Sequence, residues 1–80
     1  MPHVIFAAEM RPLTGVEDAH ISATTYRAAL RELEEKFPQL SSQIFMRFSV
    51  AIDDIMIQSP MLETFESQSE LVFFPKLPAG

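Results

Sequence analysis

The chain contains no cysteine and no tryptophan, and only two of its 80 residues are glycine. Without cysteine it cannot form a disulfide framework, a thiolate metal site or a cysteine nucleophile. Two glycines cannot supply a phosphate-cradling loop. No apolar run approaches the roughly 18–20 residues of a membrane span, and no basic region precedes an apolar segment near the amino end. We therefore expect a cytoplasmic protein that has no membrane partner.

Positive charge is also scarce, since six Lys and Arg residues face eleven Asp and Glu residues and the net charge is −5. Nucleic-acid binding depends on Lys and Arg side chains that neutralise phosphates, so a nucleic-acid partner is not expected. The acidic balance is compatible with docking onto a basic protein surface, although it more often serves solubility.

Apolar residues, by contrast, make up 48% of the chain and include seven Phe, which is enough for the core of one small domain. The clearest pattern is an amphipathic helix from Thr24 or Thr25 to Lys36, followed by the helix-stopping Pro38. Ser22 or Thr24 is the expected N-cap. Its apolar stripe consists of Tyr26, Ala29, Leu30, Leu33 and Phe37.

Alternating or β-branched segments predict five strands around this helix. They are expected at residues 3–8, 17–22, 46–53, 55–58 and 71–74, with Met10 to Gly15 as a loop and a possible turn of helix within Pro38 to Ile44. Asp53 and Asp54 fit a two-residue hairpin turn better than a metal site, because no further ligand follows at a regular spacing. His3 and His20 can approach each other across the first hairpin, but no additional ligand or nucleophile accompanies them, so we assign no metal site.

The order strand, strand, helix, strand, short strand, strand predicts an α+β fold. A β-grasp (ubiquitin-like) roll fits it, with a mixed sheet of about five strands and one main helix packed across it. We expect this domain to span residues 1–75 and a flexible tail, ending in Ala-Gly, to span residues 76–80.

The carboxyl end organises the functional hypothesis. The segment ELVFFPKLPAG begins as an apolar strand, and Pro75 is expected to break it. The tail then carries no bulky side chain after Leu77, so the carboxylate of Gly80 is sterically bare and can enter a narrow partner site. The tail residues are Lys76, Leu77, Pro78 and Ala79.

One face of the predicted sheet is a candidate docking surface. If Leu71 and Phe73 face the core, then Val72 and Phe74 face outward beside Ile5 and Ala7. An alternative is that a loop covers this face. The full set of expected partner-binding residues adds the loop Arg11 as a polar anchor and Pro75 at the end of the strand.

Three segments resemble the MoaD/ThiS sulfur-carrier family, and most closely its molybdopterin synthase small subunits: VIFAAEMRPLTG, the helix end EEKFPQL, and ELVFFPKLPAG. The most specific features are the Phe73–Pro75 triplet before a short tail and the loop with Arg11, Leu13 and Gly15. Family members end in Gly-Gly, whereas this chain ends in Ala79-Gly80.

The resemblance implies a carrier that is not itself an enzyme and binds no cofactor. An E1-like adenylating enzyme would use ATP to activate Gly80, which becomes a thiocarboxylate. The tail would then deliver sulfur to a large molybdopterin synthase subunit in a heterotetramer, where the catalytic groups lie. The alternatives are a sulfur carrier for thiamine or another product, and a ubiquitin-like modifier or binding module. An independent hydrolase is remote, because the sequence has no nucleophile–base arrangement.

Overall fold

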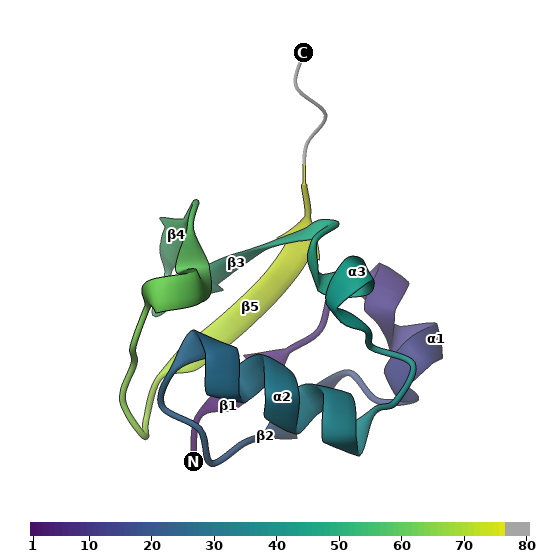
Figure 1. The fold of residues 1–80 in the computed structure, drawn as a ribbon, viewed down its shortest axis with the longest axis horizontal. Helices are drawn as coiled ribbons and strands as arrows, with labels where there is room; N and C mark the ends of the chain where they lie inside the picture. Colours follow the sequence, from purple (N-terminus) through teal and green to yellow (C-terminus); the bar gives the residue numbers. More distant parts are fainter. Residues whose placement is uncertain (77–80) are drawn as a thin grey trace.

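A five-stranded sheet forms one layer of the protein in the computed structural model, which describes residues 1–76 (Figure 1). The strands lie side by side in the order β2-β1-β5-β3-β4. Their bounds are β1 His3–Ile5, β2 Asp18–His20, β3 Phe48–Ile52, β4 Ile55–Ile57 and β5 Glu70–Pro75. Four of the predicted strands are therefore shorter than expected, and the last one is longer.

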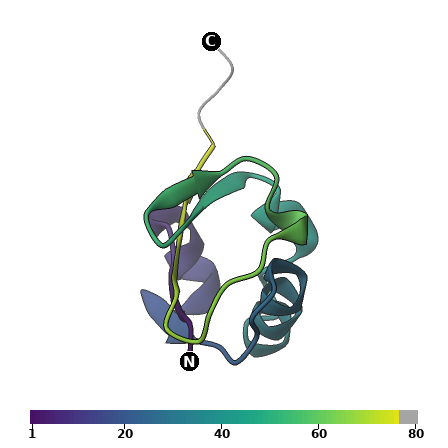
Figure 2. The same ribbon diagram turned by 90° about the vertical axis from the view of Figure 1, so that its left-hand side faces the viewer.

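The central strand β5 pairs in parallel with β1 and in antiparallel fashion with β3, so the sheet is mixed. The two outer pairs, β1–β2 and β3–β4, are antiparallel hairpins. The helix α2 (Tyr26–Lys36) lies between the two hairpins in sequence and covers one face of the sheet, as Figure 2 shows. This arrangement is the predicted β-grasp, ubiquitin-like fold.

The helix α2 starts and stops for local reasons. Thr25 is the N-cap, and its side-chain oxygen accepts a hydrogen bond from the backbone N–H of Ala28 at 3.2 Å. The cap is therefore Thr25, because its extended backbone directly precedes the first helical residue, and not Ser22 or Thr24 as predicted. The helix ends at Lys36, just before Pro38, as predicted.

The core lies between α2 and the sheet. From the helix, Tyr26, Ala29 and Leu33 are buried, while Leu30 and Phe37 pack against the core at its edge. The sheet contributes the alternating inward residues of its three inner strands, which are Val4, Val50, Ile52, Leu71 and Phe73, and the buried Phe6 follows directly after β1. The predicted apolar stripe of the helix therefore faces the sheet.

For the segment that follows β1, the structure differs from the sequence prediction in two respects. A short 3-10 helix η1 (Ala8–Met10) and the short helix α1 (Arg11–Thr14) replace the predicted loop, and they place Met10 in the core. Because β1 ends at Ile5 and not at residue 8 as predicted, strand alternation does not continue, and Ala8 is exposed at the start of η1. Gly15 ends α1 with φ 76°, a left-handed conformation that favours glycine.

The remaining connections are short. Asp53 and Asp54 form the predicted two-residue turn between β3 and β4, with φ 51° and 69° as a type I′ hairpin turn requires. A turn of helix, α3 (Ser42–Phe45), precedes β3, and a 3-10 turn, η2 (Pro60–Leu62), follows β4. None of the helices within residues 1–76 has the length and apolarity that a membrane crossing requires.

Candidate functional site

The strand β5 carries the chain out of the sheet at the end of the molecule opposite the amino terminus (Figure 1). Pro75 is paired with Phe48, and the backbone N–H of Lys76 still donates to the carbonyl of Arg47 at 3.1 Å. The strand therefore continues through Pro75, and the prediction that this proline breaks it is wrong.

The sheet accommodates Pro75 because of the hydrogen-bond alternation of an antiparallel pair. Glu70 accepts from the N–H of Asp53 at 2.9 Å, and Lys76 donates to Arg47, so the even-numbered residues of β5 bond to β3. The nitrogen of Pro75 consequently points away from β3. On that side β1 pairs only as far as Val72, so the missing N–H leaves no ladder bond unmade.

The tail itself lies outside the described residues, except for its first residue. Lys76 is exposed at the end of β5. The predicted flexibility of residues 77–80 and the predicted role of Gly80 therefore stay predictions.

The outer face of the sheet, opposite α2, carries a row of apolar residues that runs across β5 and its neighbouring strands. The register places Ile5 beside Val72, Val72 beside Ala51, and Ala51 beside Met56. These four residues come from four adjacent strands, and Met56 is 62% exposed. Phe74, paired with Ser49, extends the row toward the end of β5. We call Ile5, Ala51, Met56, Val72 and Phe74 the outer-face row.

The structure brings together three of the predicted interface residues, Ile5, Val72 and Phe74, all half-buried. Ala7 does not join them: it is only 6% exposed and belongs to the core, because the chain leaves the strand at Ile5 and turns toward η1. Arg11 is exposed on α1, and its Nη1 lies 3.7 Å from Glu17 Oε1. Pro75 is exposed at the end of β5.

Sequence reasoning missed Ala51 and Met56. Both lie in segments that were predicted as strands, and the Asp53–Asp54 turn fixes their pairing. Counting back from that turn places Met56 opposite Ala51, on the face away from the helix. The signal was therefore present in the hairpin, but only the position of β3 beside β5 connects these residues to Val72.

A polar cluster borders the outer-face row where β5 begins. The rings of His3 and His20 stack with centroids 4.7 Å apart, as their predicted proximity suggested. His3 Nε2 lies 2.6 Å from Asp18 Oδ2, and His3 Nδ1 lies 3.6 Å from Glu70 Oε2. Each imidazole nitrogen thus has a carboxylate neighbour, so the cluster joins β1 to both adjacent strands. Within residues 1–76 no three His, Cys, Asp or Glu side chains come together in a way that could hold a metal ion.

Two carboxylates stabilise turns at the same end of the sheet. Asp53 accepts from the backbone N–H of Glu70 at 2.9 Å and from the Ser69 hydroxyl at 2.7 Å, and these bonds lower the pKa of Asp53. Partial desolvation of Glu32 raises its pKa. Its carboxylate also accepts hydrogen bonds from the backbone N–H and hydroxyl of Ser22 and from the backbone N–H of Ala23, and the ammonium of Lys36 lies nearby. These interactions favour the charged form more strongly than desolvation disfavours it, so the pKa of Glu32 is lowered. Their roles are structural, so the candidate site comprises the outer-face row and the exit of β5.

Comparison with solved structures identifies two with the same architecture. "Crystal structure of SAMP1 from Haloferax volcanii" superimposes with a TM-score of 0.74 at 19% identity, over 99% of this chain and 98% of that chain. "Crystal structure of H. volcanii small archaeal modifier protein 1" gives a TM-score of 0.68 at 17% identity, over 95% and 97%. No family model and no curated protein matches the sequence. At these identities the similarity concerns the fold, and the chain has the β-grasp, ubiquitin-like fold of these archaeal proteins.

Proposed function

We propose that this protein is a ubiquitin-like carrier whose terminal Gly80 is activated by an E1-like enzyme and then carries sulfur as a thiocarboxylate. The observation that supports this most directly is the path of β5. It is held between β1 and β3 and then carries the chain out of the sheet at Lys76, only four residues before Gly80. The outer-face row beside it offers a surface for the enzymes that would handle the tail.

The chemistry requires no side chain from the carrier. A carboxylate is a poor acyl donor, so one of its oxygens would attack the α-phosphorus of ATP and release pyrophosphate, which leaves an acyl-adenylate. A hydrosulfide-level sulfur nucleophile would then displace AMP and give the thiocarboxylate. The carrier contributes a slim terminus and a surface that holds it in place.

We further propose that the sulfur serves molybdopterin formation on a large synthase subunit, with which the protein would form a heterotetramer. The support is the sequence resemblance of the Phe73–Pro75 triplet and the Arg11–Gly15 segment. The structure gives the second feature a physical reason, because Gly15 closes α1 with a positive φ. ATP would be a substrate of the activating enzyme, and this chain would bind no cofactor and perform no catalysis itself.

The penultimate Ala79 is the feature that would limit activation. If a partner requires a positive φ at this position, alanine costs about 1–2 kcal/mol relative to glycine, or roughly a ten-fold loss. The terminal glycine is kept, so the acyl chemistry is retained.

A protein modifier is the second candidate, because both structures reported above are described as small archaeal modifier proteins. In that case the same activated Gly80 would acylate lysine side chains of other proteins. Intact-mass measurement of the protein purified from its own cells separates the two. Exchange of one oxygen for sulfur supports the carrier, whereas adducts on other proteins support the modifier.

The decisive experiment is ATP–pyrophosphate exchange with the activating enzyme of the same organism. The natural chain should support exchange, and Ala79→Gly should leave it equal or raise it by up to about ten-fold. Deleting Gly80 shortens the reach by about 3.5 Å, and since a misplacement of ~1 Å can cost about a hundred-fold, exchange should vanish. Absence of exchange with both the natural chain and Ala79→Gly would reject activation and leave a binding-only domain.

A further inference from the structure

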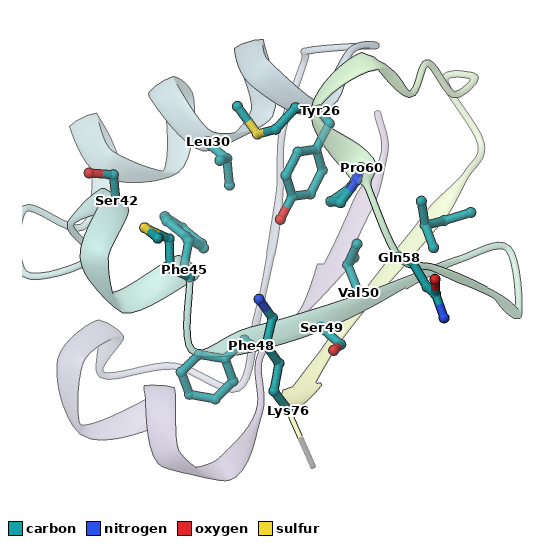
Figure 3. Close-up of a pocket in the computed structure, with 13 residues that line it drawn as sticks. Tyr26, Leu30, Ser42, Phe45, Phe48, Ser49, Val50, Gln58, Pro60 and Lys76 are labelled. Atoms are coloured by element: carbon teal, nitrogen blue, oxygen red, sulfur yellow. The ribbon is translucent and has the colours of Figure 1, made fainter. Parts of the chain in front are cut away.

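An apolar pocket of about 400 Å³ opens on the opposite side of the sheet from the outer-face row, beside the exit of β5. It lies between α2, α3, η2 and the hairpin of β3 and β4 (Figure 3). We call it the helix–sheet pocket. Its lining includes Tyr26, Leu30, Phe45, Met46, Met61 and Lys76.

Tyr26 places a polar atom in this apolar space. Tyr26 is the first residue of α2, and its hydroxyl points into the pocket in Figure 3. The residue is only 4% exposed, and burial raises the pKa of Tyr26 to about 12. Within residues 1–76 no buried side-chain nitrogen or oxygen lacks a hydrogen-bond partner, so the hydroxyl is not a buried orphan; it borders the open pocket, where it can donate to an acceptor that enters.

The rim of the pocket is adaptable and apolar. Met46 is 71% exposed and Met61 is 46% exposed, and both line the opening. Thioether side chains are flexible and polarisable, and methionine is over-used on surfaces that accept varied apolar ligands. An apolar side chain inserted from outside would therefore contact the methionines at the rim and Phe45 within.

Positive charge flanks the opening on two sides, although the whole chain is acidic. On one side the ammonium of Lys76 points toward the pocket in Figure 3. On the other, Leu30 and Met61 continue into a shallower depression that is also lined by Arg27, Arg31 and Glu34. Both arginines are exposed, and within the part of the chain that the structure describes neither forms an ion pair.

From this geometry we propose that the helix–sheet pocket binds a peptide segment of a partner protein that presents a bulky apolar side chain flanked by carboxylates. The apolar side chain enters between the methionines, and a backbone carbonyl of the peptide accepts from the Tyr26 hydroxyl. Carboxylates on either side lie near Lys76 and near the pair Arg27 and Arg31. The proposal does not rest on the activation of Gly80.

The distribution of charge favours a peptide over a small amphiphile. A fatty-acid anion carries a single carboxylate and satisfies one side of the opening, whereas the basic residues lie on both sides of it. A peptide in this position would also lie beside Lys76, the first residue of the tail. It would occupy the helix side of the sheet, so the outer-face row would stay accessible to another partner.

The test uses the full-length protein and the fluorescent capped heptapeptide DDLFLDD, with KKLFLKK and DDSGSDD as matched controls. Binding is measured by anisotropy and located by backbone amide NMR shifts. We expect DDLFLDD alone to bind and to shift residues around Tyr26 and Met61. The double variant Arg27→Ala/Arg31→Ala should bind about 2–10-fold more weakly, as for two exposed ion pairs. Tyr26→Phe should lose about five-fold, as for one hydrogen bond.

Lys36 lies on the same helix as the two arginines but lines neither depression, so Lys36→Ala is the matched control and should bind DDLFLDD as the natural chain does. Equal binding of KKLFLKK, unchanged affinity in both pocket variants, or shifts confined to Val72 and Phe74 would overturn the proposal. A further result would also overturn the proposal: if decanoate shifts the amide signals around Tyr26 and DDLFLDD does not, the pocket binds a small amphiphile.

Discussion

Replacing Leu33 by alanine tests whether the packing of α2 on the sheet holds the domain together. Leu33 is fully buried, with 0% exposure, in the middle of the buried face of α2. Removing a buried leucine side chain costs about 2–5 kcal/mol, because the transfer free energy of the lost atoms adds to the cost of the cavity. A chain of 80 residues has a total stability of about 4–12 kcal/mol, so the variant would lose a large fraction of it.

The measurement is urea unfolding followed by circular dichroism, with a thermal scan alongside. At about 4–8 °C per kcal/mol for a domain of this size, the melting temperature should fall by roughly 10–30 °C. Leu62→Ala is the matched control, because Leu62 is 88% exposed and its truncation should cost less than about 0.5 kcal/mol. A loss below about 0.5 kcal/mol for Leu33→Ala would refute the assignment of the buried face.

The other expectations concern a turn, acid stability and docking. Gly15→Ala should cost about 1–2 kcal/mol in urea unfolding, because Gly15 has φ 76° although nothing lies within 4 Å of an added methyl group; no loss would contradict this. Hydrogen bonds lower the folded-state pKa of Asp53 below its ordinary 3.8, so their stabilisation is present above this pH and disappears as the pH falls through the folded value. Asp53→Asn, which tolerates the same φ, should therefore reduce the loss of melting temperature between pH 5 and pH 2, and an unchanged profile would count against the role of Asp53. Phe74→Ser should leave the fold intact but weaken binding to the E1-like enzyme or the large synthase subunit by about thirty-fold, or 2 kcal/mol, in calorimetry. Unchanged affinity for both would remove the outer-face row from the proposal.

Local patterns in the sequence were sufficient for the main elements. The helical spacing of Tyr26, Leu33 and their neighbours predicted α2, and Pro38 predicted its end, because both depend on residues a few positions apart. The turn at Asp53 and Asp54 was predictable for the same reason. The short helices after β1 were not, since Met10 has no partner nearby in sequence and its burial depends on the assembled core.

The candidate site likewise has parts that the sequence predicted and parts that it could not predict. Alternation along β5 was enough to place Val72 and Phe74 on the outer face, but it could not show where β1 ends. Ala7 was therefore assigned to the wrong side, because alternation applies only while the strand continues. The helix–sheet pocket was invisible in the sequence, since its walls come from segments that are far apart along the chain.

The sequence by itself determined which segments are apolar and where the helix and hairpins form. Only the tertiary structure decided that β5 lies between β1 and β3 and that it continues through Pro75. The reason is that a proline is tolerated or rejected according to which side of its strand is paired, and pairing is a long-range property. The same long-range pairing aligns Ile5, Val72, Ala51 and Met56 in one row.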